Sequence, residues 1–119
     1  MPVIVAVPDS NEGRAALDAA VTEAQRLQTE LVVLDLALAS RDTPPLPDDL
    51  PVTFVQREGR SDRDPVDAVL DEIAEHGADR LVIGLRRRSP VGKALLGSVS
   101  QRLLLESPVP VLAVKPAES

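Results

Sequence analysis

The sequence predicts an α/β fold in which helices cover both faces of a mostly parallel sheet. Short, continuously apolar runs such as 3-VIVAV-7 alternate along the chain with longer stretches whose apolar residues recur at helical spacing. A run that is apolar at every position is typical of a parallel strand buried on both faces. Strands that alternate with helices imply right-handed crossovers. The length of 119 residues favours one domain, spanning 1–119.

The first half of the chain is predicted to be rich in strands. In chain order we expect a strand at 3–7, a helix at 12–28, a strand at 31–38 and an outer strand at 52–58. The apolar face of the helix comprises Ala16, Ala20, Ala24 and Leu27, with Leu17 and Val21 beside it. The segment 40-SRDTPPLPDDLP-51 contains four prolines, which oppose a helix. We therefore predict a loop between the second and third strands.

The second half carries clearer helix signals. Asp64 is a suitable N-cap, Pro65 fits the first helical position and Gly77 is a typical stop, so we predict a helix at 65–77. Its apolar stripe is Val66, Val69, Leu70 and Ile73. The remaining predictions are a strand at 80–84, a helix at about 93–107 and a final strand at 109–115.

The composition excludes several classes of function. The absence of cysteine excludes disulfides, thiolate metal sites and cysteine nucleophiles. His76 is the single histidine, and no Ser-His-Asp triad is evident. It precedes Gly77 at the end of a predicted helix, where a cationic side chain would complement the helix dipole. A net charge of −6 opposes binding to nucleic acid or anionic membranes. No apolar run approaches the ~20 residues that span a bilayer, and no leader pattern follows Met1. We expect a cytoplasmic protein that is not an enzyme.

One cationic segment, 84-GLRRRSPVGKALLGSVSQ-101, stands out in this acidic chain. It follows a predicted strand, and ligands of open α/β sheets bind beyond the carboxyl ends of the strands. The segment is either a phosphate cradle or a solvated basic turn, and the residues alone favour both equally. A P-loop would need glycine at Arg87 and a hydroxyl at Ala94, so that motif is absent. No G-x-G-x-x-G occurs either.

The same segment resembles the signature of the universal stress protein family. In nucleotide-binding members the signature is Gly, two residues, Gly, nine residues, then Gly-Ser or Gly-Thr. Gly84 matches the first glycine, Gly97 and Ser98 match the end at the same spacing, and 99-VSQRLLLESPVPVLAVKP-116 resembles the last helix and strand. The resemblance covers essentially the whole chain. It implies a flavodoxin- and Rossmann-like parallel sheet of five strands in the order 3-2-1-4-5, and a dimer.

Arg87 departs from that signature, because it occupies the position of the middle glycine. In nucleotide-binding members that glycine lets the backbone approach the phosphates. Two outcomes stay open. The guanidinium group meets phosphate, with Gly92 providing flexibility in the loop, or it fills the site and abolishes binding.

The turn after the first strand also departs from the family. The common pattern there is Asp-x-Ser, whereas this chain has Pro8-Asp9-Ser10. Asp9 and Ser10 either contact the ligand or cap the following helix, and capping is at least as well supported. By its position after the second strand, Leu36 matches a residue whose backbone meets the base, but its residue type favours a plain core role.

The resemblance implies a stress-response regulator or sensor that binds ATP or another adenine nucleotide, with Mg²⁺ as the companion ion. In this role Gly84 passes close to the ribose and base, the start of the last helix binds phosphate, and arginine and lysine side chains neutralise charge. The implied binding residues are Asp9, Ser10, Leu36, Gly84, Arg87, Arg88, Gly92, Lys93, Gly97, Ser98 and Val99. Hydrolysis should be slow, since no general base is evident.

Two other functions compete with this one. Arg87 and Pro8 favour a dimeric interaction module of the same family that binds another protein and no nucleotide. An unrelated flavodoxin-like domain would need a phosphate loop after the first strand, and 8-PDSNEG-13 is a poor one. In either family reading, the apolar strand 109–115 lies at a sheet edge, and we expect it to form a homodimer with its two-fold mate.

Overall fold

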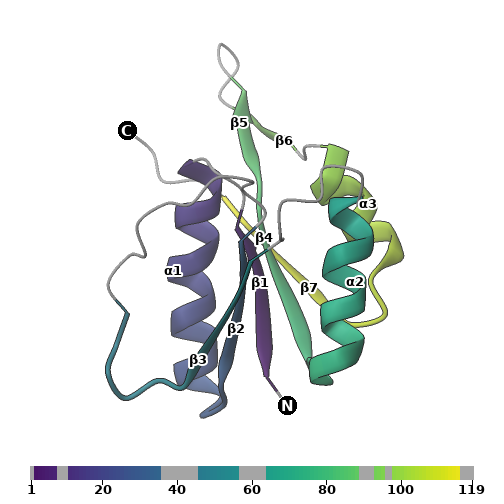
Figure 1. Ribbon diagram of the computed structural model, residues 1–119. Helices are drawn as coiled ribbons and strands as arrows, with labels where there is room; N and C mark the ends of the chain where they lie inside the picture. Colours follow the sequence, from purple (N-terminus) through teal and green to yellow (C-terminus); the bar gives the residue numbers. More distant parts are fainter. Residues whose placement is uncertain are drawn as a thin grey trace.

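The computed structural model describes residues 2–7, 11–35, 46–56, 64–88, 93–95 and 98–115. A five-stranded sheet forms the centre, in the order β3-β2-β1-β4-β7, and every pairing in it is parallel (Figure 1). This confirms the predicted fold class. The elements are β1 (Val3–Val7), α1 (Asn11–Arg26), β2 (Leu31–Asp35), β3 (Val52–Gln56), α2 (Pro65–His76), β4 (Arg80–Gly84), β5 (Arg86–Arg88), β6 (Lys93–Leu95), α3 (Ser98–Glu106) and β7 (Val111–Val114).

Two apolar cores lie on the two faces of the sheet. In β1, Val3 and Val5 face α1, whereas Ile4 and Ala6 face α2 and α3. Because successive strand residues point to opposite faces, a central strand needs apolar residues at every position. The continuous apolar run of β1 is therefore explained, and the prediction of a doubly covered strand is confirmed.

Helix α1 approaches the sheet through small side chains. Ala16, Ala20 and Ala24 are fully buried, as the helical spacing predicts. Leu27 was predicted to share this face, but it is 36% exposed because α1 ends at Arg26. Gln28 then adopts a left-handed conformation (φ 54°), and the N–H of Thr29 donates to the carbonyl of Ala24. This bond satisfies a terminal helix carbonyl without a glycine.

Helix α2 begins and ends as its sequence predicts. The Asp64 carboxylate accepts a hydrogen bond from the N–H of Val66 at 2.9 Å, and Pro65 occupies the first turn. Gly77 ends the helix in a left-handed conformation (φ 61°), which glycine adopts without steric cost. His76 lies in the last turn, 3.8 Å from the Glu72 carboxylate, which agrees with a role at the helix end.

The segment after β4 differs from the prediction. We expected a loop and then a helix from about residue 93, whereas β5 and β6 form an antiparallel hairpin and α3 begins at Ser98. The apolar spacing of the helix pattern runs back through Gly97, and glycine disfavours a helix interior. Backbone pairing with β5 explains why residues 93–95 are extended rather than helical.

The bounds of β1 and β4 match the prediction, whereas those of three other strands differ from it. β2 ends at Asp35 and β3 at Gln56, and the remaining positions predicted for them, 36–38 and 57–58, lie outside the described residues. β7 begins at Val111 rather than at 109. Pro110 precedes it, and proline has no N–H to donate to the neighbouring strand.

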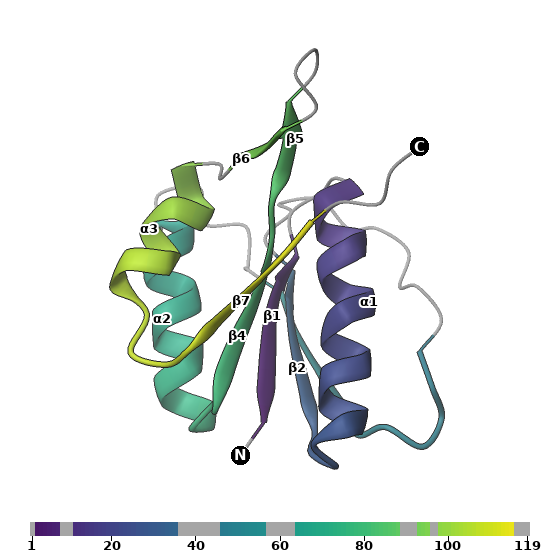
Figure 2. The ribbon, with the colours of Figure 1, turned by 180° about the vertical axis from the view of Figure 1, so that it is seen from behind.

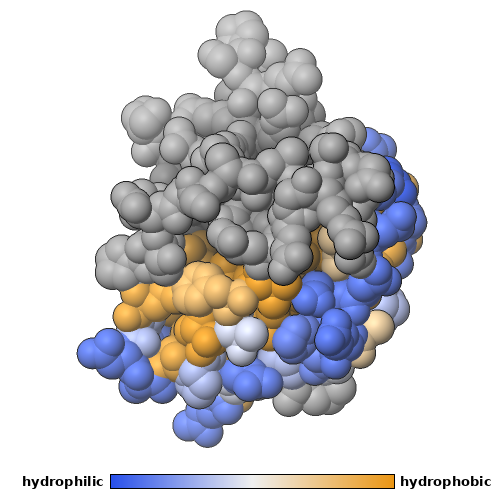
Figure 3. All heavy atoms as spheres, in the orientation of Figure 1, coloured by the Kyte–Doolittle hydropathy of each residue, from blue (hydrophilic) through white to orange (hydrophobic). Residues whose placement is uncertain are grey.

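The outer strands leave apolar side chains exposed. β3 is one edge of the sheet, as predicted, and Phe54 on it is 48% exposed. Figure 3 shows an apolar band on this face, over the region where Figure 1 places β3. β7 is the other edge of the sheet (Figure 2). Leu112 on this strand is 38% exposed. Neither α1, α2 nor α3, the helices of the described ranges, is long and apolar enough to cross a membrane.

Candidate functional site

The carboxyl ends of β1 and β4 form the place where a ligand is expected. These strands are neighbours at the centre of the sheet. From β1 the chain continues through α1 to β2, whereas from β4 it continues through α3 to β7 on the opposite side. The two helices lie on opposite faces of the sheet (Figure 1). Strand order reverses here, and such reversals create the ligand crevice of open α/β sheets.

Gly84 is the last residue of β4 and is buried. It pairs with Val114 of β7, so its backbone belongs to the sheet. Among the glycines that the structure describes, Gly77 has the positive φ, so the conformation of Gly84 is open to other residues. Close packing, or the close approach of a ligand, is then the remaining reason for a glycine at the end of this strand.

The cationic residues lie on the β5–β6 hairpin, which extends beyond the sheet above β4 in Figure 1. Arg87 is opposite Ala94, and Arg88 is opposite Lys93. Directly opposed positions share one face of an antiparallel pair, and successive positions alternate. Arg88 and Lys93 therefore occupy positions of one face of the hairpin, whereas Arg87 occupies a position of the other.

The start of α3 lies at the same end of the sheet. Ser98 is its first residue, and Val99 packs against the core beneath α2 and α3. The first N–H groups of a helix have no partner within it, so they favour anions. The outer parts of the predicted signature, Gly84 and Ser98, thus flank the hairpin as the spacing requires.

Five predicted site residues lie outside the described residues: Asp9, Ser10, Leu36, Gly92 and Gly97. The residues that the structure brings to the carboxyl end of β4 are Gly84, Arg87, Arg88, Lys93, Ser98 and Val99. The hairpin residues and Ser98 are placed at this end of the strand by the path of their backbone.

Sequence reasoning missed Ser100. Its hydroxyl donates to the carbonyl of Gly84 at 3.3 Å, across a sequence separation of 16 residues. Ser100 lies two residues after Ser98, but no sequence rule links a helix serine to a distant strand carbonyl. The structure therefore adds this residue to the candidate site.

Arg102 of α3 is committed to protein partners. Its guanidinium donates to Asp64 at 2.7 Å and to Glu106 at 3.1 Å. The hydrogen bond to Asp64, and then that to Glu106, raise the pKa of Arg102 above its ordinary value. Its charge stabilises the contact between α3 and the start of α2. Within the described ranges, no cluster of three or more acidic or histidine side chains offers a metal site.

Comparisons with known proteins identify the family of the chain. Residues 48–115 match the model of the Universal stress protein family. A universal stress protein of Mycolicibacterium smegmatis is 40% identical over 117 residues, covering 87% of this chain and 89% of that protein. The chain belongs to the universal stress protein family.

Solved structures of universal stress proteins share its fold. The structure from Archaeoglobus fulgidus is 26% identical with a TM-score of 0.74, covering 97% of this chain and 98% of that one. A second Archaeoglobus fulgidus structure, a complex with dAMP, is 22% identical with a TM-score of 0.70 and the same coverage of both chains. The sheet order of this universal stress protein is thus the one expected from the family resemblance.

Proposed function

We propose that this universal stress protein binds an adenine nucleotide, with ATP as the leading candidate, and acts as a cytoplasmic sensor or regulator of the stress response. The observation that carries the proposal is the position of Gly84 and Ser98. The spacing of the family signature brings both residues to the carboxyl end of the sheet, on either side of the hairpin. A protein of this fold holds dAMP in the complex from Archaeoglobus fulgidus.

The start of α3 is the proposed phosphate site. Gly97, Ser98 and Val99 would present N–H groups, and the cationic residues Arg88 and Lys93 would neutralise charge. Asp9, Ser10, Leu36 and Gly92 complete the proposed set on the strength of the family resemblance. Mg²⁺ would accompany ATP through the phosphate oxygens.

Arg87 acts as a clamp in this proposal. Its backbone belongs to an extended antiparallel strand, so the position does not demand the left-handed conformation that an arginine resists. Guanidinium groups bind phosphate oxygens in pairs, which makes arginine a suitable replacement for glycine at a phosphate. The protein acts by binding rather than by catalysis, since the sequence offers no nucleophile–base pair.

The alternative function is a dimeric interaction module that binds no nucleotide. The observation that favours it is Arg87 itself, because a long side chain replaces the glycine of nucleotide-binding members. In that case the guanidinium group fills the space that phosphate would occupy.

Calorimetric titration with ATP and Mg²⁺ separates the two functions. The variants are Arg87→Gly, which restores the signature, and Arg86→Gly, which removes the same charge from the same strand at a position where the signature specifies no residue. Micromolar binding by the native protein, weakened more by Arg87→Gly than by Arg86→Gly, supports the clamp. Binding by Arg87→Gly alone means that arginine blocks the site. If no form binds, the interaction module is the better account.

We also propose that the protein is a homodimer through β7. This strand pairs with β4 on one side and is the outer strand of the sheet (Figure 2). Its residue Leu112 is exposed. An exposed apolar edge promotes association unless it is covered, and a two-fold mate covers it symmetrically. Light scattering at micromolar concentration should give twice the monomer mass, and Leu112→Asp should shift it toward the monomer. A native protein that scatters as a monomer contradicts this assembly.

A further inference from the structure

We propose that Ser100 is a positioning residue, which fastens the start of α3 to the end of β4 and so fixes the strand end from which β5 continues. This inference deepens the proposed nucleotide site and rests on it for its functional meaning. The contact itself is independent of any ligand, because both partners belong to the protein.

The peptide unit between Gly84 and Leu85 is held at both of its polar atoms. The Gly84 carbonyl accepts from the Ser100 hydroxyl at 3.3 Å, and the Leu85 N–H donates to the carbonyl of Val114 at 2.8 Å. A peptide unit is planar, so two bonds to its opposite ends fix its orientation. The chain continues from this unit through Leu85 into β5, which begins at Arg86. The unit therefore sets the direction in which β5 leaves the sheet.

The hydroxyl of Ser100 has an unusual partner for a helix serine. Serines further along a helix commonly bond to a carbonyl three or four residues earlier, but Ser100 lies in the first turn of α3, where those carbonyls precede the helix. Ser100 instead bonds to a carbonyl 16 residues earlier, at the end of a strand. The bond therefore closes the segment that contains the hairpin and the start of α3, rather than stabilising the helix locally.

The other contacts of α3 orient the helix but act on different neighbours. Leu103 is buried in the core with Val99 beside it, and Arg102 bonds to Asp64 at the start of α2. These contacts hold α3 against α2 and the sheet face. Ser100 adds the contact to the strand end itself, which sets the separation of Gly84 from the helix start that would bind phosphate.

Ser100→Ala tests the inference, with Ser107→Ala as the matched control. Ser107 lies just beyond the other end of α3, where its half-buried hydroxyl donates to the carbonyl of Val109 at 2.9 Å. Each variant removes one hydroxyl. Ser100→Ala loses one hydrogen bond, and Ser107→Ala loses two, because the Ser107 hydroxyl also accepts from the N–H of Val109 at 3.2 Å. Ser100→Thr keeps the hydroxyl and should behave as the native protein.

The first measurement is hydrogen exchange of backbone amides, followed by mass spectrometry without nucleotide. Ser100→Ala should speed exchange in residues 85–88 by about three- to tenfold, the effect of one lost hydrogen bond, while Ser107→Ala leaves that segment unchanged. The second is ATP titration, in which Ser100→Ala should bind about three- to tenfold more weakly than native protein, Ser100→Thr and Ser107→Ala.

The two measurements separate the inference from the proposed function. If native protein binds no adenine nucleotide, the proposed function fails, and the exchange data still decide whether Ser100 fixes the strand end. Exchange in 85–88 that is the same in Ser100→Ala as in Ser107→Ala overturns the inference. If exchange in residues 85–88 is faster in Ser100→Ala but its ATP affinity equals that of the native protein, the functional part of the inference is overturned. The orientation of the peptide unit would then have no effect on ligand binding.

Discussion

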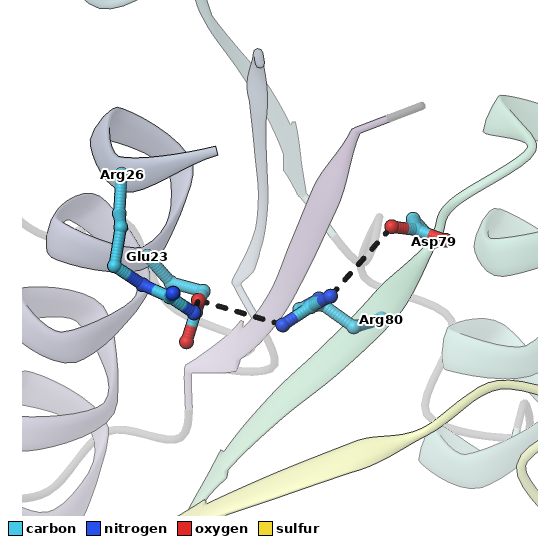
Figure 4. Close-up of polar contacts among 4 residues, drawn as sticks. All are labelled: Glu23, Arg26, Asp79 and Arg80. Carbon is cyan, nitrogen blue, oxygen red and sulfur yellow. Dashed lines mark hydrogen bonds and ion pairs between the residues drawn. The ribbon is translucent and has the colours of Figure 1, made fainter. Parts of the chain in front are cut away.

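Arg80 and Gly84 stand at the two ends of β4, and the structure holds these ends in different ways. At the amino end, charged side chains meet: Arg80 lies 3.4 Å from Glu23 of α1 and 3.8 Å from Asp79 (Figure 4). Glu23 also contacts Arg26. At the carboxyl end, Gly84 is held by strand pairing and by the neutral hydroxyl of Ser100.

The difference shows a division of roles along one strand. The side chain of Glu23 is 12% exposed, and its ion pair with Arg80 links α1 to the sheet. The carboxyl end has a residue without a side chain, and the contacts to it come from backbone and from one small residue. The two ends of β4 are about 13 Å apart, because each residue of a strand advances the chain by about 3.3 Å. Charged side chains therefore make the contacts at the amino end of β4, whereas the carboxyl end is held by backbone groups and one hydroxyl.

Glu23→Gln should have the largest effect on stability among changes at the amino end. Glu23 serves both Arg26 and Arg80, and the buried Nε of Arg80 has no hydrogen-bond partner among the described residues. When the carboxylate charge of Glu23 is removed, the positive charge of Arg80 loses a nearby negative charge. We expect the free energy of unfolding to fall by about 1–2 kcal/mol in urea denaturation. An unchanged midpoint would show that the network contributes nothing to stability.

Asp79→Asn should have a smaller effect, although it touches the same arginine. The Asp79 side chain is 47% exposed and lies 3.8 Å from Arg80, so water screens this pair. Exposed ion pairs are worth about 0–1 kcal/mol, and we expect a change below about 0.5 kcal/mol in the same denaturation experiment. A loss as large as that of Glu23→Gln would mean that Asp79, and not α1, holds the amino end.

Much of the fold is predictable from the sequence. β1 and α2 are specified locally, β1 by apolar residues at each position and α2 by Asp64 and Gly77 at its ends. The hairpin was missed because residues 93–95 carry good helix formers, and their extended state depends on pairing with β5. Leu27 was misplaced because α1 ends one residue before it.

The candidate site was predicted less completely than the fold. Gly84 and Ser98 were found through the spacing of a known signature, and the structure brings them to one end of the sheet. Ser100 was not found, because a contact across 16 residues depends on how α3 packs and leaves no local pattern. Whether Arg87 binds or blocks phosphate depends on side-chain chemistry that no spacing rule contains.

The central claim is that the ligand site lies at the carboxyl end of β4, and ATP titration of Gly84→Val beside Glu23→Gln tests it most directly. A valine side chain at this buried strand end should block close approach of the nucleotide and weaken binding by about 100-fold or more, whereas Glu23→Gln should keep native affinity. Thermal unfolding confirms that each variant is folded, and Gly84→Ala provides a milder change if valine prevents folding. Native ATP affinity in the Gly84→Val variant, or loss of ATP binding in the Glu23→Gln variant, would contradict this location of the site.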